Sequence, residues 1–428
     1  MSKMEDILND NALHTVPDAQ TVSGWRIAVI IIGVAIGLPM MLTGAKLAYE
    51  MSGLSAFGAF FVGGLMLAIL GGFTGIVGAR QKLSTYVIIQ QTFGTSGAVI
   101  INMLLAFTIF AWFSITAAVF GSALAGALGE IIQLKVSGVL LTFIGVVLMV
   151  LTSIFGFKAL DKLSLAAVPV LMVFLGYLAV AGLRADNAPI STDFDIVTIG
   201  FGEGVSMVVG SFIVGIVIFP DFCRYARNQS DGIIAALVSM GIGMPVVLTL
   251  SAIPSLMVGE TDIIKLLFAL GAGAPILFLL VFATWTTNAS NLYSGSLALA
   301  ATFSSVKKWK LTILGGGVGL VLAISGIANK LTDFLLLLGV MIPPIASIYI
   351  IDHLVFKRNT SKYQSDFVQK KLNIQALISW GLGSLFAFMT SAEVLIFTSF
   401  PSLDSIVVSS LCFYVFTRIT LYRQAALA

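Results

Sequence analysis

The stretch WRIAVIIIGVAIGLPMMLTGAK, residues 25–46, is long and apolar enough to cross a bilayer, yet two glycines and a proline interrupt it. A second apolar stretch, IVTIGFGEGVSMVVGSFIVGIVIFP at 196–220, carries glycines and a proline at matching places. Lipid offers no partners to backbone hydrogen-bonding groups, so irregular backbone survives at membrane depth only where protein or a cavity surrounds it. Paired broken helices in the two halves of a chain therefore predict a binding site of the kind found in secondary transporters.

The composition places the whole chain in a membrane. Of its 428 residues, 58% are hydrophobic and 10% are charged, and the mean hydropathy is +1.05. A soluble domain carries about 25% charged residues. The formal net charge of +3 gives no argument for a nucleic-acid partner, and the two cysteines and two histidines suggest neither a disulfide framework nor a metal cluster. The polar start of the chain has no apolar h-region and is typical of a cytoplasmic tail.

Apolar stretches of sufficient length predict twelve membrane spans. They run over 25–46, 54–77, 98–124, 137–156, 164–183, 196–220, 232–258, 274–302, 311–327, 331–356, 372–390 and 402–422. The stretch 83–93 is too short to span and is expected at the membrane interface. With both termini in the cytoplasm, most of the 23 Lys and Arg residues fall on the cytoplasmic side, as the positive-inside rule requires. The exceptions are Lys46, Lys135, Arg184, Lys265 and Lys330.

Spans 1–5 and 6–10 predict two repeats, and an odd number of spans in each repeat places the second upside down relative to the first. Each repeat ends in a helix that contains proline, Pro169 in the fifth span and Pro343 with Pro344 in the tenth. We therefore expect an all-α integral membrane protein. Its predicted parts are a cytoplasmic tail at 1–24, a ten-helix core at 25–356, and two additional helices with a tail at 357–428.

The eighth span contains the string WTTNASNLY, in which Thr286 and Thr287 are adjacent. Together with the carbonyl of Ala283, they give one helix face three oxygen atoms. The break in the first span would free the carbonyls of Gly33 and Ile36. Hard cations take oxygen ligands, and unwound backbone supplies them in transporters, so the five residues predict a sodium site. The alternative is that the threonines bond back to their own i−4 carbonyls.

Two further groups of residues predict a ligand site near mid-depth. In the sixth span, a kink around Gly210, Ser211, Phe212 and Gly215 would expose backbone groups and a ring face to a ligand; the alternative is a helix-packing face of small residues. Trp112 lies in the middle of the third span, whereas membrane tryptophans cluster at interfaces. It predicts an aromatic platform for a planar ligand, or else plain packing.

Glu203 is a carboxylate that this assignment places inside the sixth span. Ionisable groups within a membrane are functional candidates, which makes Glu203 a possible gate or proton site. The alternative is a position at the level of the lipid headgroups. No HExxH, GxSxG or Walker pattern accompanies it, so the sequence does not indicate an enzyme. A channel would need a continuous polar pore, for which the spans hold too few polar residues.

At these residues the chain resembles the nucleobase–cation symporter family, which includes bacterial cytosine permeases and hydantoin and allantoin transporters. The matching strings are GARQKLST at 78–85, VVGSFI at 208–213, PDFCRYARN at 220–228, WTTN at 285–288 and IPPIASIYIIDHL at 342–354. The resemblance covers nearly the whole chain. It implies a LeuT-like fold of ten core helices plus two, with import of a heterocycle such as cytosine, a purine or a hydantoin across the inner (plasma) membrane, coupled to sodium or a proton. In that family the sodium ligands correspond to Gly33, Ile36, Ala283, Thr286 and Thr287.

The chain departs from the cytosine permeases of this family at positions that could read a pyrimidine. Those relatives carry Gln three residues before the Trp, where this chain has Ile109, and Asn where it has Ala283; they also carry Phe near Gly37. Losing two amides removes groups on which discrimination of a polar ligand depends. We therefore expect a different heterocycle, with Thr116 and Asn291 supplying replacement contacts. The expected substrate-binding residues are Gly37, Trp112, Thr116, Ser211, Phe212, Gly215 and Asn291. A proton-coupled LeuT-fold carrier of another small solute is the alternative, and beyond that solute and the lipid bilayer the sequence indicates no partner and no cofactor.

Overall fold

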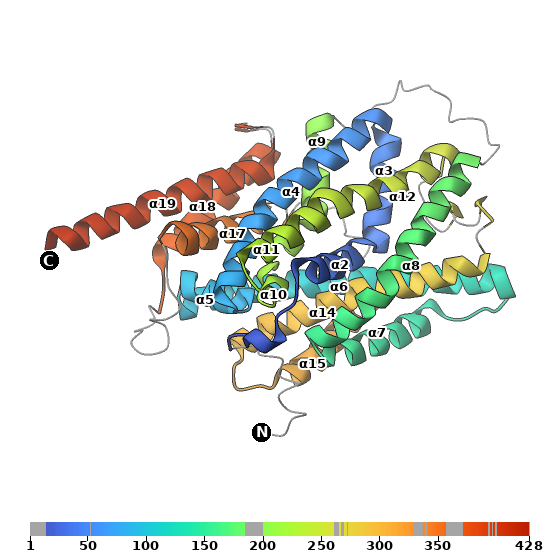
Figure 1. The fold of residues 1–428 in the computed structure, drawn as a ribbon, viewed down its shortest axis with the longest axis horizontal. Coiled ribbons are helices and arrows are strands. Elements are labelled where there is room, and N and C mark those ends of the chain that lie inside the picture. The colour runs from blue at the N-terminus through green and yellow to red at the C-terminus, as the bar shows by residue number, and fades with distance from the viewer. Residues whose placement is uncertain are drawn as a thin grey trace.

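The computed structural model is helical throughout the part of the chain that it describes, apart from an isolated parallel bridge between Val22 and Ala226. The described residues are 14–51, 53–184, 200–260, 265–266, 269–271, 273–327, 337–338, 340–356, 371–392, 394–395, 397–398 and 400–427. The helices of the first half are α2 (Gly24–Ala35), α3 (Leu38–Glu50), α4 (Gly53–Gln81), α5 (Thr85–Phe93), α6 (Thr95–Ile132), α7 (Gly138–Ile154) and α8 (Phe157–Arg184) (Figure 1). Those of the second half are α9 (Phe201–Val217), α10 (Pro220–Cys223), α11 (Gln229–Ala236), the π-helix η2 (Leu237–Gly243), α12 (Met244–Val258), α14 (Gly273–Thr302), α15 (Lys308–Ile324), α17 (Pro343–Ile350), the π-helix η4 (Ile351–Val355), α18 (Ile374–Ser391) and α19 (Pro401–Leu427).

The predicted spans correspond to these helices, although the tenth lies only in part within the described residues. Six described helical stretches are individually long and apolar enough to cross a membrane. They are Leu54–Gln81, Thr95–Gly129, Phe157–Arg184, Gln229–Val258, Ile374–Ser391 and Pro401–Gln424. Shorter apolar helices in the described residues are Gly24–Ala35, Gly138–Ile154, Met207–Val217 and Pro343–Val355. The eighth span corresponds to α14, which is 30 residues long. Residues 1–13 of the predicted tail lie outside the described residues.

The first span is broken where the sequence predicts it. α2 ends at Ala35 and α3 begins at Leu38, and the two residues between them leave the helical conformation. Ile36 has φ −78° and ψ 47°, and Gly37 is extended with φ −103° and ψ 157°. Pro39 lies in the first turn of α3, where its missing N–H breaks no helical hydrogen bond. The break therefore exposes the carbonyl end of α2 and the amide end of α3 side by side.

The sixth span is also interrupted, but later than expected. α9 is a continuous helix through Gly210 and Gly215, so the kink predicted there is wrong. The interruption comes at Ile218 and Phe219, immediately before α10. Pro220 explains the position, because a proline has no N–H to donate to an upstream carbonyl.

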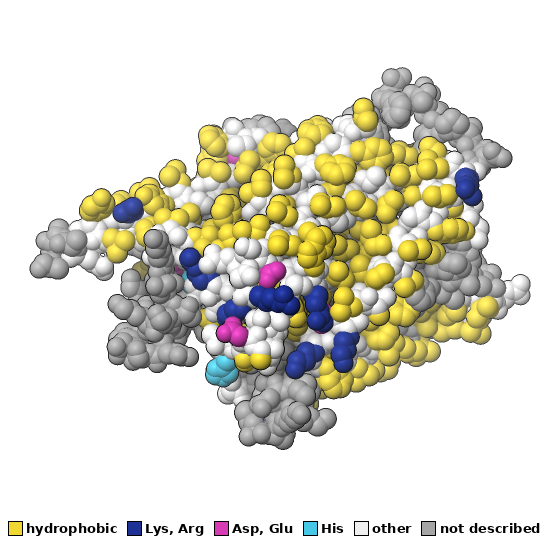
Figure 2. All heavy atoms as spheres, in the orientation of Figure 1, with side chains coloured by type: hydrophobic (Ala, Val, Ile, Leu, Met, Phe, Trp, Pro, Cys, Tyr) yellow, Lys and Arg dark blue, Asp and Glu magenta, His cyan; other side chains and the backbone are white. Residues whose placement is uncertain are grey.

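The outer surface is apolar, and the short helix α5 is not part of it. Figure 2 shows hydrophobic side chains over the face formed by α4, α12 and α8, with Lys and Arg gathered nearer α2 and α10. The α5 residues Tyr86, Ile88, Ile89 and Phe93 are fully buried, against α6, α14, α17 and α18. The 83–93 stretch therefore packs within the bundle, and its place at the membrane interface stays a prediction. α18 and α19 pack on each other at one side of the bundle and reach the rest through α17 (Figure 1).

Candidate functional site

The carbonyl end of α2 is capped by two threonines from α14. Thr286 Oγ1 lies 2.9 Å from Gly33 O and 2.9 Å from Ala283 O. Thr287 Oγ1 donates to Val34 O at 2.9 Å. The last carbonyls of a helix have no partner within it, so these hydroxyls satisfy groups that the break would otherwise leave exposed. The contact joins two helices 253 residues apart in sequence.

The structure thus brings together most of the oxygen atoms that the sequence predicts for an ion. Gly33, Ala283 and Thr286 meet directly, and Ile36 is fully buried at the end of α2 in the same core cluster as Ala283. The sequence does not predict that the Val34 carbonyl belongs to this group, because nothing in a sequence shows which carbonyl a threonine from another helix will reach. The site contains neutral oxygens of the kind that a hard cation prefers.

Close packing fixes the position of the break. A Cβ atom at Gly33 would lie 2.8 Å from Val168 Cγ2 on α8, and a Cβ atom at Gly37 would lie 2.6 Å from Thr287 Oγ1. Neither position has room for a side chain, so both glycines are required by close approach rather than by their φ angles. α2 is also held near its start, where the guanidinium of Arg26 forms an ion pair with Asp161 of α8.

Next to the break is a cavity of about 260 Å³, and all seven residues expected to bind substrate line it. They are Gly37, Trp112, Thr116, Ser211, Phe212, Gly215 and Asn291. The lining comes from α2, α3, α6, α9, α10 and α14. A volume of this size is at the lower end of small-molecule sites and suits a single or fused ring.

The apolar part of this cavity is aromatic on two sides. Trp112 of α6 is half-buried, and Phe212 of α9 is almost fully buried. The ring of Phe212 lies over Gly215 one turn later, where a Cβ atom would be only 2.4 Å from its Cε1. Ile109, one turn before Trp112, presents hydrocarbon to the cavity at the position where cytosine permeases of the family carry an amide. Aromatic faces and aliphatic groups with few polar atoms are the usual lining for a planar ligand.

One expected participant, Ala283, lies outside the cavity lining in this structure. Ala283 is fully buried beside the ion-site oxygens and is not among the lining residues, so only Ile109 marks a missing amide in the cavity. The side chain of Glu203 lies outside the described residues. Ser290 does line the cavity, although it was not predicted. It lies four residues after Thr286, and this helical spacing could have identified it.

Three of the family strings meet at the end of the molecule where α10 lies, and of their residues Phe222 reaches the cavity lining. Asp221 accepts a hydrogen bond from the backbone N–H of Thr85 at 2.8 Å, and Gln81 Nε2 is 3.1 Å from His353 Nδ1. Asp221 and His353 are no more than 1% exposed to solvent. These buried contacts join α4, α5, α10 and η4 to one another.

The same end closes the cavity. Phe222, which lines the cavity, lies 6.1 Å from the ring of Tyr293 between centroids. Arg224 donates to the Tyr293 hydroxyl at 2.7 Å, and both side chains are fully buried. The ring of Tyr225 stacks on Phe157 with centroids 3.9 Å apart. These five buried side chains, which we call the closing layer, pack together at the end of the cavity where α10 lies.

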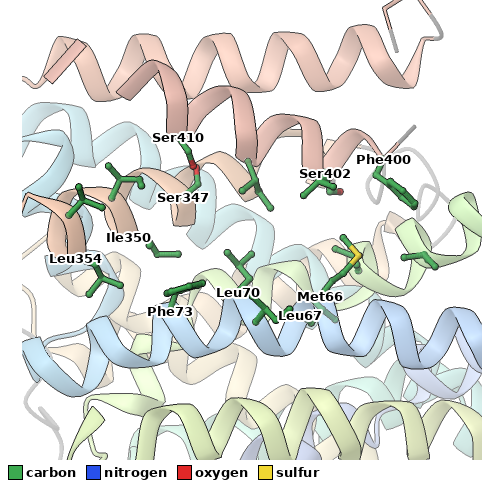
Figure 3. Close-up of a pocket in the computed structure, with 17 residues that line it drawn as sticks. Met66, Leu67, Leu70, Phe73, Ser347, Ile350, Leu354, Phe400, Ser402 and Ser410 are labelled. Atoms are coloured by element: carbon green, nitrogen blue, oxygen red, sulfur yellow. The ribbon is translucent and has the colours of Figure 1, made fainter. Parts of the chain in front are cut away.

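A larger hollow of about 480 Å³ lies elsewhere, between α4, α9, α17 and α19 (Figure 3). Its lining is nearly all hydrocarbon, as Phe73, Leu70 and Ile350 illustrate. One of its few polar groups, the Ser347 hydroxyl, already lies 2.7 Å from Ser409 Oγ. A polar heterocycle would lose its hydrogen bonds to water there without replacement, so the smaller cavity is the better ligand site.

The chain is similar to known permeases along nearly its whole length. A family model described as permease for cytosine/purines, uracil, thiamine, allantoin matches residues 15–409. The cytosine permease of Escherichia coli (strain K12) is 28% identical over 380 residues, 88% of this chain and 88% of that protein. The hydantoin permease of Microbacterium maritypicum is 24% identical over 396 residues, 84% of this chain and 78% of that one. The structure of Mhp1, a nucleobase-cation-symport-1 family transporter, closed with bromovinylhydantoin bound, matches with a TM-score of 0.82 at 20% identity, covering 94% of each chain. The LeuT-like fold expected from the sequence is therefore confirmed.

Proposed function

Because the chain belongs to the family of permeases for cytosine/purines, uracil, thiamine and allantoin, we propose that it imports a nucleobase-like heterocycle together with sodium. Family membership makes it a multi-pass membrane transporter of small heterocycles rather than an enzyme. The proposal adds the coupling ion, the site residues and the direction of transport. The heterocycle would lie between Trp112 and Phe212, in the cavity that both side chains line.

The observation that carries the proposal is that Thr287 contacts both the cavity and the carbonyl end of α2. Its side chain lines the cavity, and its hydroxyl caps Val34 at the carbonyl end of α2. A ligand in the cavity and an ion at the helix end would therefore both contact one residue. Such a shared residue gives each site a physical reason to respond to the other, which is what symport requires.

Sodium is the coupling ion that the chemistry of the helix end favours. Gly33, Ala283 and Thr286 offer neutral oxygen atoms that carry no charge for a proton to neutralise. Half-helix carbonyl ends coordinate sodium in repeat-built carriers. When an ion binds, the Thr286 hydroxyl turns its proton away from the carbonyls and offers its lone pairs instead.

The distribution of charge supports an orientation with both termini in the cytoplasm of a bacterial inner-membrane protein. Most Lys and Arg residues of the chain fall in segments that this topology makes cytoplasmic. Import would then draw on the inside-negative potential, since each sodium ion moving inward gains about 2.3 kcal/mol per 100 mV. Uptake of a neutral heterocycle is consequently expected to be electrogenic.

Uptake into proteoliposomes under separate sodium and pH gradients tests the proposal. We expect the sodium gradient to drive accumulation of a hydantoin, purine or pyrimidine, and the double variant Thr286→Ala/Thr287→Ala to abolish it. Thr302→Ala is the matched control, since Thr302 lies on the same helix and donates to Ala298 O at 3.1 Å, outside both sites. Equal accumulation without sodium, or in the double variant, would show that the ion site is wrong.

A further inference from the structure

The hollow between α4, α9, α17 and α19 shares no lining residue with the heterocycle cavity. The helix α9 stands between the two spaces. Val205 and Val209, four residues apart, line the hollow from one face of this helix. Met207, Ser211 and Gly215, also spaced by four, line the cavity from the other face. Ligand binding in the cavity therefore gives the second space, of about 480 Å³, no role.

The hollow opens onto the outer surface of the bundle. Its floor is buried, since Leu67 of α4, Val209 of α9 and Ile350 of α17 are 1%, 5% and 8% exposed. Its rim is exposed, with Ile69 and Phe73 of α4 at 55% and 46%. The helix that carries this rim is long and apolar enough to cross a membrane. In a multi-pass membrane transporter such exposed apolar side chains face lipid, so the hollow is continuous with the surface that contacts the bilayer.

The chemistry of the lining favours an apolar occupant. The described lining carries no charged side chain, and its polar residues are Ser347, Ser402 and Ser410. The Ser347 hydroxyl already lies 2.7 Å from Ser409 Oγ and 3.0 Å from Pro344 O. A buried water needs about two to four polar partners, which this lining does not offer together. An empty space, in turn, deprives the surrounding side chains of dispersion contacts, so hydrocarbon is the occupant that suits the hollow.

The dimensions of the hollow fit an acyl chain better than a helix. Its lining runs along α19 from Ser402 to Ser410 and along α4 from Met66 to Phe73 (Figure 3). At about 1.5 Å per residue these stretches are about 12 Å and about 10 Å long. The hydrocarbon core of a bilayer is about 30 Å thick, so a chain from one leaflet reaches about 15 Å. A helix about 10 Å across would fill about 900 Å³ over the same length, nearly twice the volume of the hollow.

We propose that this hollow is a lipid site, in which an acyl chain of a membrane phospholipid lies between α4 and α19. The chain would pack against Leu67, Leu70 and Phe73 on one side and against Leu403 and Ile406 on the other. Because α18 and α19 reach the rest of the bundle mainly through α17, the chain would fill the gap beside that contact and hold α19 against the core. It would also support α9 on the face opposite to the heterocycle cavity.

Lipid retention by matched tryptophan variants tests the site. Leu403→Trp places an indole in the hollow, whereas Leu411→Trp places one on the same helix at a side chain that is 61% exposed and outside the lining. Each protein is purified from vesicles of phosphatidylethanolamine and phosphatidylglycerol, delipidated in detergent and examined by native mass spectrometry. The parent and Leu411→Trp should retain a phospholipid, and Leu403→Trp should retain severalfold less. Added phospholipid should raise the melting temperature of the first two proteins and leave that of Leu403→Trp unchanged. Equal retention and equal melting shifts in the two tryptophan variants would overturn the inference.

A phospholipid with a photoactivatable diazirine in its acyl chain locates the bound chain. Irradiated proteoliposomes should carry more tag on peptides from 401–410 and 343–355 than on the exposed remainder of α19, and Leu403→Trp should lose this preference. Ser410→Leu fills another part of the hollow with a smaller change and should lose it in the same way, which keeps the test decisive if Leu403→Trp does not fold. Uniform tagging of all exposed helices contradicts the inference. A dimer of the parent that both filling variants dissociate also contradicts it, because a second copy of the chain would then occupy the hollow.

Discussion

At the scale of single residues, Trp112 contributes most of the aromatic surface expected to hold a planar ligand. Its half-buried ring lines the cavity from α6, while Phe212 lines it from α9. Stacking on an aromatic ring contributes roughly 1–3 kcal/mol per base. Trp112→Ala should therefore weaken ligand binding about ten- to hundredfold in a calorimetric titration. Trp309→Ala, at a half-buried tryptophan outside the lining, is the control; equal affinity in wild type and Trp112→Ala would mean that Trp112 only packs.

Residue type made much of this site predictable, and tertiary contact decided the rest. Trp112 and the Thr286–Thr287 pair stand out because their chemistry is unusual at mid-span. Val34 and Ser290 do not, since a carbonyl and a serine look alike wherever they occur in an apolar helix. Ala283 shows that residue type can also mislead. An Ala where relatives carry an amide suggested a change in ligand recognition, but the structure places Ala283 beside the ion-site oxygens.

At the scale of helices, the glycines of α9 provide a paired test of whether that helix bends. A Cβ atom at Gly215 would lie 2.4 Å from the ring of Phe212, whereas at Gly210 nothing lies within 4 Å. Gly215→Ala should push the ring into the cavity and lower ligand affinity at least tenfold. Gly210→Ala should leave affinity unchanged, and its better helix propensity should slightly raise the melting temperature. Comparable loss in both variants would indicate that α9 must flex around these glycines.

The helices themselves follow from apolar length, but their interruptions follow from local backbone chemistry. The break before Leu38 was predictable because Gly37 and Pro39 act together within three residues. In the sixth span we predicted the interruption at the glycines. Glycine permits a bend without imposing one. In the structure α9 remains helical through both glycines. Pro220 imposes the interruption because it lacks an N–H.

At the scale of the whole molecule, the closing layer determines which end of the cavity is shut. In that layer Arg224 and Tyr293 are fully buried and joined by a hydrogen bond of 2.7 Å. The adjacent Cys223 is a free, fully buried cysteine, so its reactivity reports whether the layer is open. Import requires the layer to separate at the end that the proposed topology places in the cytoplasm. Weakening the layer should favour that open state.

Maleimide labelling of Cys223 in a Cys412→Ser background measures this opening. Tyr293→Phe removes the shortest of the described hydrogen bonds that Arg224 donates, so labelling should become severalfold faster than in the parent. Ser239→Ala removes a buried hydroxyl bond to Ala235 O in η2, which contributes no side chain to the layer, and should not change the rate. If Tyr293→Phe labels no faster than the parent while remaining folded, the layer is not the closure.

The central claim is that one residue, Thr287, links the ligand cavity to the ion site, and thermodynamic linkage between the two ligands tests it most directly. Sodium should lower the ligand Kd by a factor corresponding to about 1–3 kcal/mol, and the ligand should raise sodium affinity by the same factor. Thr287→Val keeps the side-chain shape but loses the hydroxyl that reaches Val34 O. We expect this variant to bind ligand with a Kd that no longer depends on sodium. A Kd independent of sodium in the wild type, or an undiminished sodium effect in Thr287→Val, would contradict the account.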